Sequence, residues 1–109
     1  MRFALDEIVT FAEEPDSPYT VQAVSERYAI LTRPMTQEDA DNEEWEGPID
    51  GNVMYSIVDA ETMTRSKNDL IFNPYDYNTR AGCEQSLADL EAGELGLSHR
   101  REIPVVLSE

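Results

Sequence analysis

Cysteine, histidine and basic residues are all scarce in this sequence, and each scarcity narrows the possible classes of protein. Cys83 is the only cysteine, so an internal disulfide is impossible. Only eight Lys and Arg residues stand against 23 Asp and Glu residues, which gives a formal net charge of −15 at pH 7. Because each phosphate contact needs a basic side chain, this balance argues against direct binding to DNA, RNA or anionic membranes.

Long apolar runs are also missing. No stretch approaches the roughly 20 apolar residues that a membrane span needs, and the first residues lack the apolar run of a signal peptide. We therefore expect a cytoplasmic protein. The length of 109 residues predicts a single domain over residues 1–109, and the 40% hydrophobic content is sufficient for one modest core.

Alternating and β-branched apolar residues predict a chain made mostly of short strands. In the first strand Glu7 and Ile8 break the alternation, so a bulge or two short strands is possible. A turn at 25–27 between two strands predicts a hairpin. In the last strand Pro104 cannot donate to a ladder, which would confine that strand to a sheet edge. The expected strands are residues 2–11, 19–24, 28–32, 53–58, 63–65, 69–72 and 103–107.

One helix is expected, over residues 79–93, because three apolar side chains recur there at helical spacing. Gly93 suits the left-handed position that follows a helix. Gly82 inside the helix costs about 1 kcal/mol and suggests a close approach to the sheet. This order of elements predicts an α+β fold: a small antiparallel sheet or SH3-like partial barrel of five to six strands, with one C-terminal helix and a final edge strand. The apolar stripe consists of Cys83, Leu87 and Leu90.

A long acidic segment is the most informative feature of the sequence. Between Arg33 and Arg65 there are nine acidic side chains and no basic one. Residues 35–52 are predicted to form an acidic loop, and loops of this length are often functional or disordered. Unpaired like charges repel one another, so a chain that concentrates them usually gains solubility or a cationic partner.

Several motifs outside that segment resemble known proteins. They are YTVQAVSERYAILTRP (19–34), YSIVD (55–59), NDLIF (68–72), TRAGCE (79–84) and SHRR (98–101). Together they resemble a family of small uncharacterised proteins of bacteriophages and integrated mobile elements. The resemblance implies a phage or mobile-element origin, and it carries no activity or site residues. The sequence departs from the family between Pro34 and Val53, where a short connection is expected and the acidic segment stands instead.

Two interpretations of the acidic segment stay open. In the first, closely packed carboxylates imitate phosphates, which recur about every 3.4 Å along a strand of nucleic acid. They would block the basic nucleic-acid-binding surface of a host protein, as DNA-mimic inhibitors of CRISPR or restriction systems do, with Trp45 as an exposed anchor. In the second, the acidity serves only solubility, Trp45 folds back onto the core, and the protein is a small accessory or structural interaction module. The predicted partner-binding residues are Glu38, Asp39, Asp41, Glu43, Glu44, Trp45 and Glu46.

A metal site is not predicted, although the spacing of four acidic residues resembles that of a calcium-binding loop. Asp39, Asp41, Glu43 and Asp50 match positions 1, 3, 5 and 12 of a calcium-binding loop. Glu44 stands where that loop needs glycine for its sharp turn, and the final bidentate glutamate is replaced by Asp50. Weak, adventitious binding of divalent cations is the most that this spacing indicates, and we expect no cofactor.

The other candidate groups have ordinary structural explanations. Cys83 lies on the apolar stripe, where a free cysteine usually acts as a small hydrophobe, and no Gly-x-Ser-x-Gly, Walker-type or Cys-x-x-Cys motif is present. We therefore expect a protein that is not an enzyme. The basic cluster at 99–101 is read as a solvated turn before the last strand, with a phosphate site as the weaker alternative. Phe72, Tyr75 and Tyr77 are expected to pack a connector onto the core and not to form a recognition patch.

Overall fold

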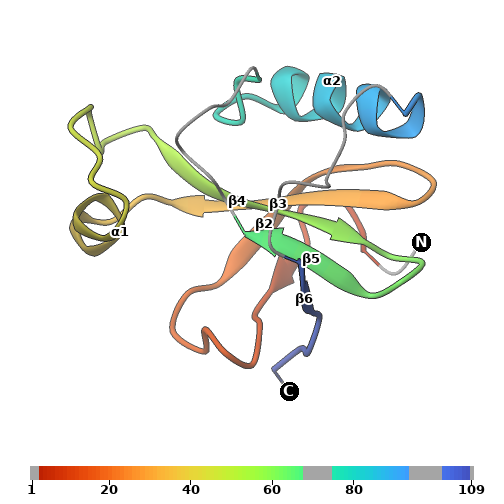
Figure 1. Cartoon of the computed structure of the whole chain (residues 1–109), viewed down its shortest axis with the longest axis horizontal. Helices are drawn as coiled ribbons and strands as arrows, with labels where there is room; N and C mark the ends of the chain where they lie inside the picture. The colour runs from red at the N-terminus through yellow and green to blue at the C-terminus, as the bar shows by residue number, and fades with distance from the viewer. Residues whose placement is uncertain (1–2, 68–74, 94–101, 109) are drawn as a thin grey trace.

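Six strands form one antiparallel sheet in the described part of the chain, and each strand pairs with the next in sequence order (Figure 1). The computed structural model describes residues 3–67, 75–93 and 102–108. The structure confirms an α+β protein that is mostly sheet. The strands are β1 (Ile8–Val9), β2 (Tyr19–Val24), β3 (Tyr28–Pro34), β4 (Val53–Asp59), β5 (Thr64–Lys67) and β6 (Glu102–Pro104).

The sheet curls into a half-barrel, and its two ends meet at one point. Phe11, just after β1, forms an isolated antiparallel bridge with Leu107, just after β6. Ala12 N donates to Val106 O, and Ser108 N donates to Thr10 O, each at 2.8 Å. These bonds satisfy backbone groups that an open sheet edge would leave to solvent.

Most of the expected strands are present, and the two terminal ones are shorter than expected. The hairpin of β2 and β3 and the central strand β4 confirm the sequence prediction. The first strand shrinks to β1 and the bridge at Phe11, because Asp6 adopts a left-handed conformation with φ 68° and turns the chain. The last strand ends at Pro104, and β5 begins one residue later than expected, at Thr64. The strand expected at 69–72 lies outside the described residues.

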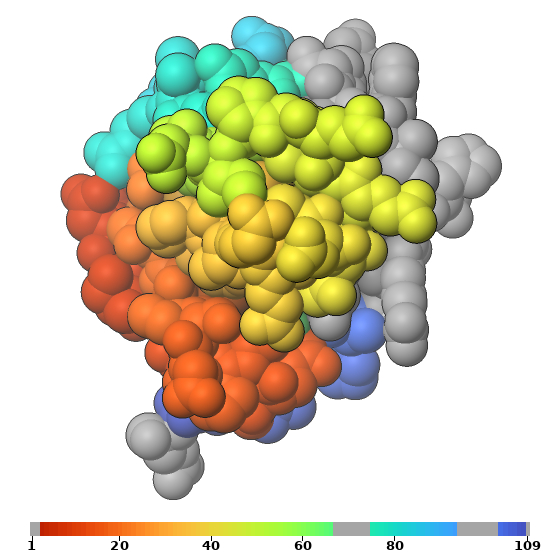
Figure 2. Space-filling model, turned by 90° about the vertical axis from the view of Figure 1, so that its left-hand side faces the viewer, coloured from red at the N-terminus to blue at the C-terminus, as the bar shows by residue number. Residues whose placement is uncertain are grey.

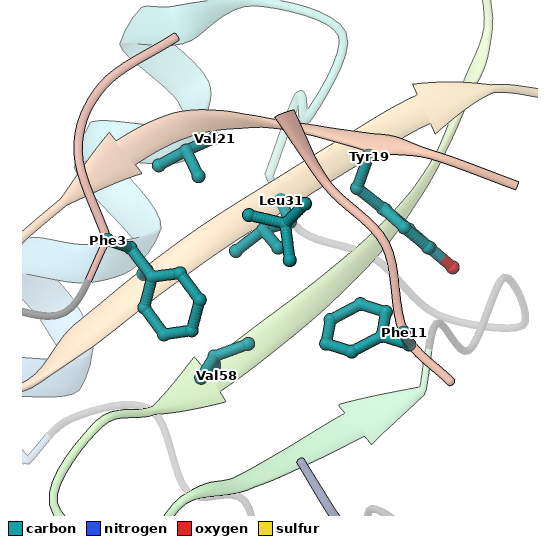
Figure 3. Packing of buried hydrophobic residues seen from close by; sticks show 8 residues of the cluster. Phe3, Phe11, Tyr19, Val21, Leu31 and Val58 are labelled. Atoms are coloured by element: carbon teal, nitrogen blue, oxygen red, sulfur yellow. The ribbon is translucent and has the colours of Figure 1, made fainter. Parts of the chain in front are cut away.

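The inner face of the curled sheet encloses an apolar core (Figure 3). Successive side chains of a strand point to opposite faces, so Ala29 and Leu31 of β3 face this core. In β2 the alternation is interrupted by a register shift between Val21 and Ala23, which places Ala23 on the other face. Burying each large apolar side chain contributes roughly 1.5–3 kcal/mol. The buried members are Phe3, Val9, Phe11, Tyr19, Val21, Ala29, Leu31 and Val58.

The helix α2 (Arg80–Glu91) covers the outer face of the sheet (Figure 1). The predicted stripe of Cys83, Leu87 and Leu90 is buried there against outward-facing residues of β3 and β4, which include Ile30 and Ile57. Thr79 caps the helix by accepting from Gly82 N at 3.0 Å, and Gly93 has the left-handed φ of 76° expected after its end. Neither described helix is long and apolar enough to cross a membrane.

Gly82 does mark a close approach, but its neighbour is not the sheet. A Cβ atom built on Gly82 would lie 1.8 Å from the carbonyl oxygen of Asp76. The prediction of an approach to the sheet is therefore wrong, because the connector before α2 folds back over the first turn of the helix. That connector packs as expected: Tyr77 is buried and stacks on Tyr55 with ring centroids 3.8 Å apart. Phe72 lies outside the described residues.

Candidate functional site

The acidic segment connects β3 to β4, and it is not the structureless loop that the sequence predicted. It contains a short helix, α1 (Gln37–Asn42). Thr36 accepts from Asp39 N at 3.2 Å, while the Asp39 carboxylate accepts from Thr36 N at 2.9 Å. This reciprocal capping box satisfies backbone donors at the start of a helix, and the acidic residues of the first turn suit the positive end of the helix dipole. The Thr-x-x-Asp pattern was visible in the sequence.

Asp39 is held by an arginine of the same molecule. Arg33 Nη1 and Nη2 donate to Asp39 Oδ2 and Oδ1 at 2.6 and 2.8 Å. The Asp39 side chain is only 13% exposed. The guanidinium of Arg33 and the bonds from Thr36 lower the pKa of this carboxyl from 3.8 to about 2. Its charge is thus neutralised inside the fold, and Asp39 leaves the set of partner-binding residues that we propose below.

Replacing Asp39 with asparagine is expected to reduce stability at neutral pH but not in strong acid. A pKa lowered from 3.8 to about 2 contributes stability that is present above pH 4 and is lost as the pH falls through 2. The shift corresponds to about 2 kcal/mol. Urea denaturation should therefore show D39N less stable by about 2 kcal/mol at pH 6, and a gap that closes near pH 2. An equal gap at both pH values would contradict this assignment.

Trp45 fixes the acidic segment to the sheet. Its indole is half-buried and packs against Met35, Ala40 and Met54. Trp45 N donates to Ala40 O at 2.8 Å, and the indole Nε1 donates to Pro48 O at 3.1 Å. This is the folded-back position that the second interpretation expected. A direct contact of its exposed part with a partner stays a prediction.

The other predicted carboxylates lie on the surface. Within the described residues they take part in no ion pair. Figure 2 shows α1 and the segment after it covering the centre of one face of the molecule. The charge of this face therefore projects into solvent. Its exposed acids are Glu38, Asp41, Glu43, Glu44, Glu46 and Asp50.

A second acidic segment, residues 13–17, lies beside α1 on the same face (Figure 2). The strand β2 begins where this segment ends, and its antiparallel neighbour β3 ends where the acidic connection starts. The two segments therefore leave the sheet at the same end. Between them lies a cleft of about 560 Å³, lined on one side by Glu14 and Asp16 and on the other by Glu38 and Glu43. Sequence reasoning missed Glu14 and Asp16, because their position depends on strand pairing.

Two arginines from the inner face of the sheet form ion pairs beneath the cleft. Arg65 is 1% exposed, and its guanidinium lies 3.8 Å from the centre of the Phe11 ring. It donates to Ser56 Oγ at 2.9 Å, to Glu14 Oε2 at 2.5 Å and to Glu13. Arg33 lies 3.8 Å from Glu14 in addition to its pair with Asp39. Glu14 thus bridges both guanidinium groups, which fixes the 13–17 segment over the open end of the sheet.

The other candidates offer little chemistry in the part of the chain that the structure describes. No group of three or more metal-ligating side chains comes together there. The calcium-type spacing is also broken in space, because the Asp39 carboxylate faces Arg33. Cys83 is fully buried, and desolvation raises the pKa of its thiol to about 11, so the reactive thiolate is disfavoured. Residues 99–101 lie outside the described ranges.

The fold and the site together define a small acidic α+β domain in which α1 and the segment after it present a group of exposed carboxylates. Comparison with protein-family models, curated proteins and solved structures finds no significant match. The resemblance to phage and mobile-element proteins therefore stays a prediction.

Proposed function

We propose that this is a non-enzymatic binding protein whose acidic face occupies a basic, nucleic-acid-binding surface of another protein. One observation carries the proposal: the exposed carboxylates of α1 and the following segment are grouped on one face and have no cation partner among the described residues. Fields of this kind speed association with an oppositely charged surface. The proposed contact residues are Glu38, Asp41, Glu43, Glu44 and Glu46.

The support beneath these carboxylates favours the proposal over a purely solvated loop. The capping box, the Arg33–Asp39 pair and the packed Trp45 hold the segment in one arrangement. A preorganised face loses less conformational entropy when a partner binds than a flexible acidic tail does. Trp45 then acts by positioning its acidic neighbours.

The proposed outcome is competitive exclusion of nucleic acid from the partner. This is the mode of action of DNA-mimic inhibitors of CRISPR or restriction systems, and it would suit the phage or mobile-element origin and cytoplasmic setting expected from the sequence. We also propose that the half-barrel has an SH3-like topology.

Capture from a nuclease-treated bacterial lysate tests the proposal, followed by a DNA- or RNA-binding assay on the purified captured protein. The wild type should bind a nucleic-acid-binding protein and displace its nucleic acid. Changing Glu38, Asp41, Glu43, Glu44 and Glu46 to their amides should weaken this binding at least tenfold, which is about 1.4 kcal/mol. The control variant E26Q/E84Q removes exposed acids at the opposite end of the β2–β3 hairpin and on α2, and it should bind almost normally.

Salt provides an independent readout of the same proposal. Screening shortens the range of surface charges to about 8 Å at 0.15 M ionic strength and about 3 Å at 1 M. Association with the partner should therefore slow steeply as salt rises. An affinity that is flat from low to high salt, or an amide variant that competes with nucleic acid as well as the wild type, would refute the acidic-face mechanism.

A second candidate function is a small accessory or structural interaction module. The observation that favours it is a set of large apolar side chains exposed near the junction of the sheet ends, of which Ile8 is 63% and Val106 59% exposed. This module would act through the sheet edge or the helix, by oligomerisation or by binding another protein, and acidity would serve only solubility. Full partner binding by the amide variant described above would select this function.

A further inference from the structure

The cleft between α1 and the 13–17 segment has the shape and charge of a receptor for a cationic side chain. Its volume of about 560 Å³ is within the usual range of ligand sites, and it opens at the mouth of a curled sheet, where such sites often occur. Five carboxylates and a single arginine line it. The carboxylates come from two parts of the chain and are Glu14, Asp16, Glu38, Asp39 and Glu43.

The lining carboxylates fall into two groups. Glu14 and Asp39, at the base, are already bonded to Arg65 and Arg33, so the positive charges beneath the cleft are compensated internally. Asp16, Glu38 and Glu43 stand at the rim, exposed and without an ion pair inside the described ranges. An incoming anion would meet this uncompensated negative rim, whereas an incoming cation would be attracted by it.

The walls also suit the aliphatic part of a long basic side chain. Met54 and Tyr19 line the cleft, and Tyr19 already has the Arg33 guanidinium 5.4 Å from its ring centre. Long cationic side chains bury their methylene groups against apolar surface while the charged head stays near polar groups. A guanidinium can in addition donate to carboxylates on both walls, because its five N–H groups form a planar fork.

We propose that this cleft binds an arginine side chain of the basic partner and is the specific contact within the acidic face. The inference rests on the proposed function, and it identifies where the partner is anchored. Acids outside the cleft then contribute mainly to the long-range field, whereas Glu38 and Glu43 contact the bound guanidinium. Lysine fits less well, because a compact ammonium cannot bond both walls in the same way.

Titration with N-acetylarginine amide tests the cleft directly, monitored by ¹H–¹⁵N NMR at constant ionic strength. Saturable shifts are expected at residues 14–17 and 36–43, with a dissociation constant on the order of millimolar for so small a ligand. The lysine analogue should bind more weakly, and the uncharged citrulline analogue should cause no saturable shift in these residues. Equal binding of citrulline, saturable shifts confined to other residues, or phosphate bound in the cleft as tightly as the arginine amide would overturn the inference.

A matched pair of variants separates the cleft from the general field. E38Q/E43Q removes two rim carboxylates, and E44Q/E46Q removes the same charge from residues that do not line the cleft. The first pair should raise the dissociation constant of the arginine amide about tenfold, which is about 1.4 kcal/mol. The second should change it less than twofold. Equal effects of the two variants on this dissociation constant would overturn the proposal that the cleft binds arginine.

Measuring how the same two variants bind the partner distinguishes a failure of this inference from a failure of the proposed function. If both pairs weaken partner binding equally, the acidic face functions without a specific cleft. If neither pair weakens it, the proposed function itself fails. A larger loss with E38Q/E43Q than with E44Q/E46Q, together with the NMR result, supports both.

Discussion

Replacing Arg65 with leucine is expected to reduce the free energy of unfolding by about 3–5 kcal/mol, the usual effect of breaking a buried ion pair. Arg65 is 1% exposed, and its partner Glu14 is only 19% exposed. Without the guanidinium, Glu14 keeps a poorly solvated charge, Ser56 Oγ loses a donor, and the Phe11 ring loses the cation above its face. Leucine fills part of the space, so the loss comes mainly from electrostatics and not from a cavity.

Urea denaturation at pH 7 measures this loss as a shift of the midpoint at constant slope. The control is R80Q, because Arg80 is 42% exposed and pairs with Asp6, which is 69% exposed. An exposed pair of this kind contributes about 0–1 kcal/mol. The double variant R65L/E14Q should recover part of the loss, since it removes a carboxylate that has lost the shorter of its two ion pairs. If R65L and R80Q had equal effects, the network beneath the cleft would have no special role in stability.

Local patterns were sufficient to predict most of the fold. The β2–β3 hairpin, β4 and the buried stripe of α2 follow from apolar periodicity and from turn residues that act on their immediate neighbours. The shortened first strand could not be predicted, because the turn at Asp6 is stabilised by a backbone bond from Asp6 N to Val21 O on another strand. In this segment the tertiary contact outweighs the strand preference that the alternating apolar residues indicate.

The candidate site was predicted only in part, because some of its interactions join residues that are distant in the sequence. The acidic residues and their number are visible in the sequence, and the capping box that makes α1 was readable from Thr36 and Asp39. The pairing of Asp39 with Arg33 was not foreseen, although the two are six residues apart. The opposite wall of the cleft, with Glu14, required knowledge of which strands are neighbours.

Only a glycine fits position 82, and G82A is expected to destabilise the protein by about 3 kcal/mol, the upper range for overpacking. Helix propensity alone predicts the opposite sign, a gain of about 1 kcal/mol. The reversal follows from the Asp76 carbonyl, whose oxygen would lie 1.8 Å from the new Cβ. That oxygen also accepts from Thr79 N at 3.3 Å and from Thr79 Oγ1 at 3.2 Å, so moving it disturbs the cap of α2.

The comparison variant A88G isolates the propensity effect, because Ala88 lies in the same helix and is exposed. It should cost about 1 kcal/mol. Both variants are measured by urea denaturation, and the near-ultraviolet circular dichroism of the stacked Tyr55–Tyr77 pair reports whether the connector has moved. A stabilising G82A would mean that the connector does not hold its place over the helix. A loss with altered tyrosine signals would instead show that residues 75–79 and α2 pack as one unit, which explains why this helix tolerates a glycine in its first turn.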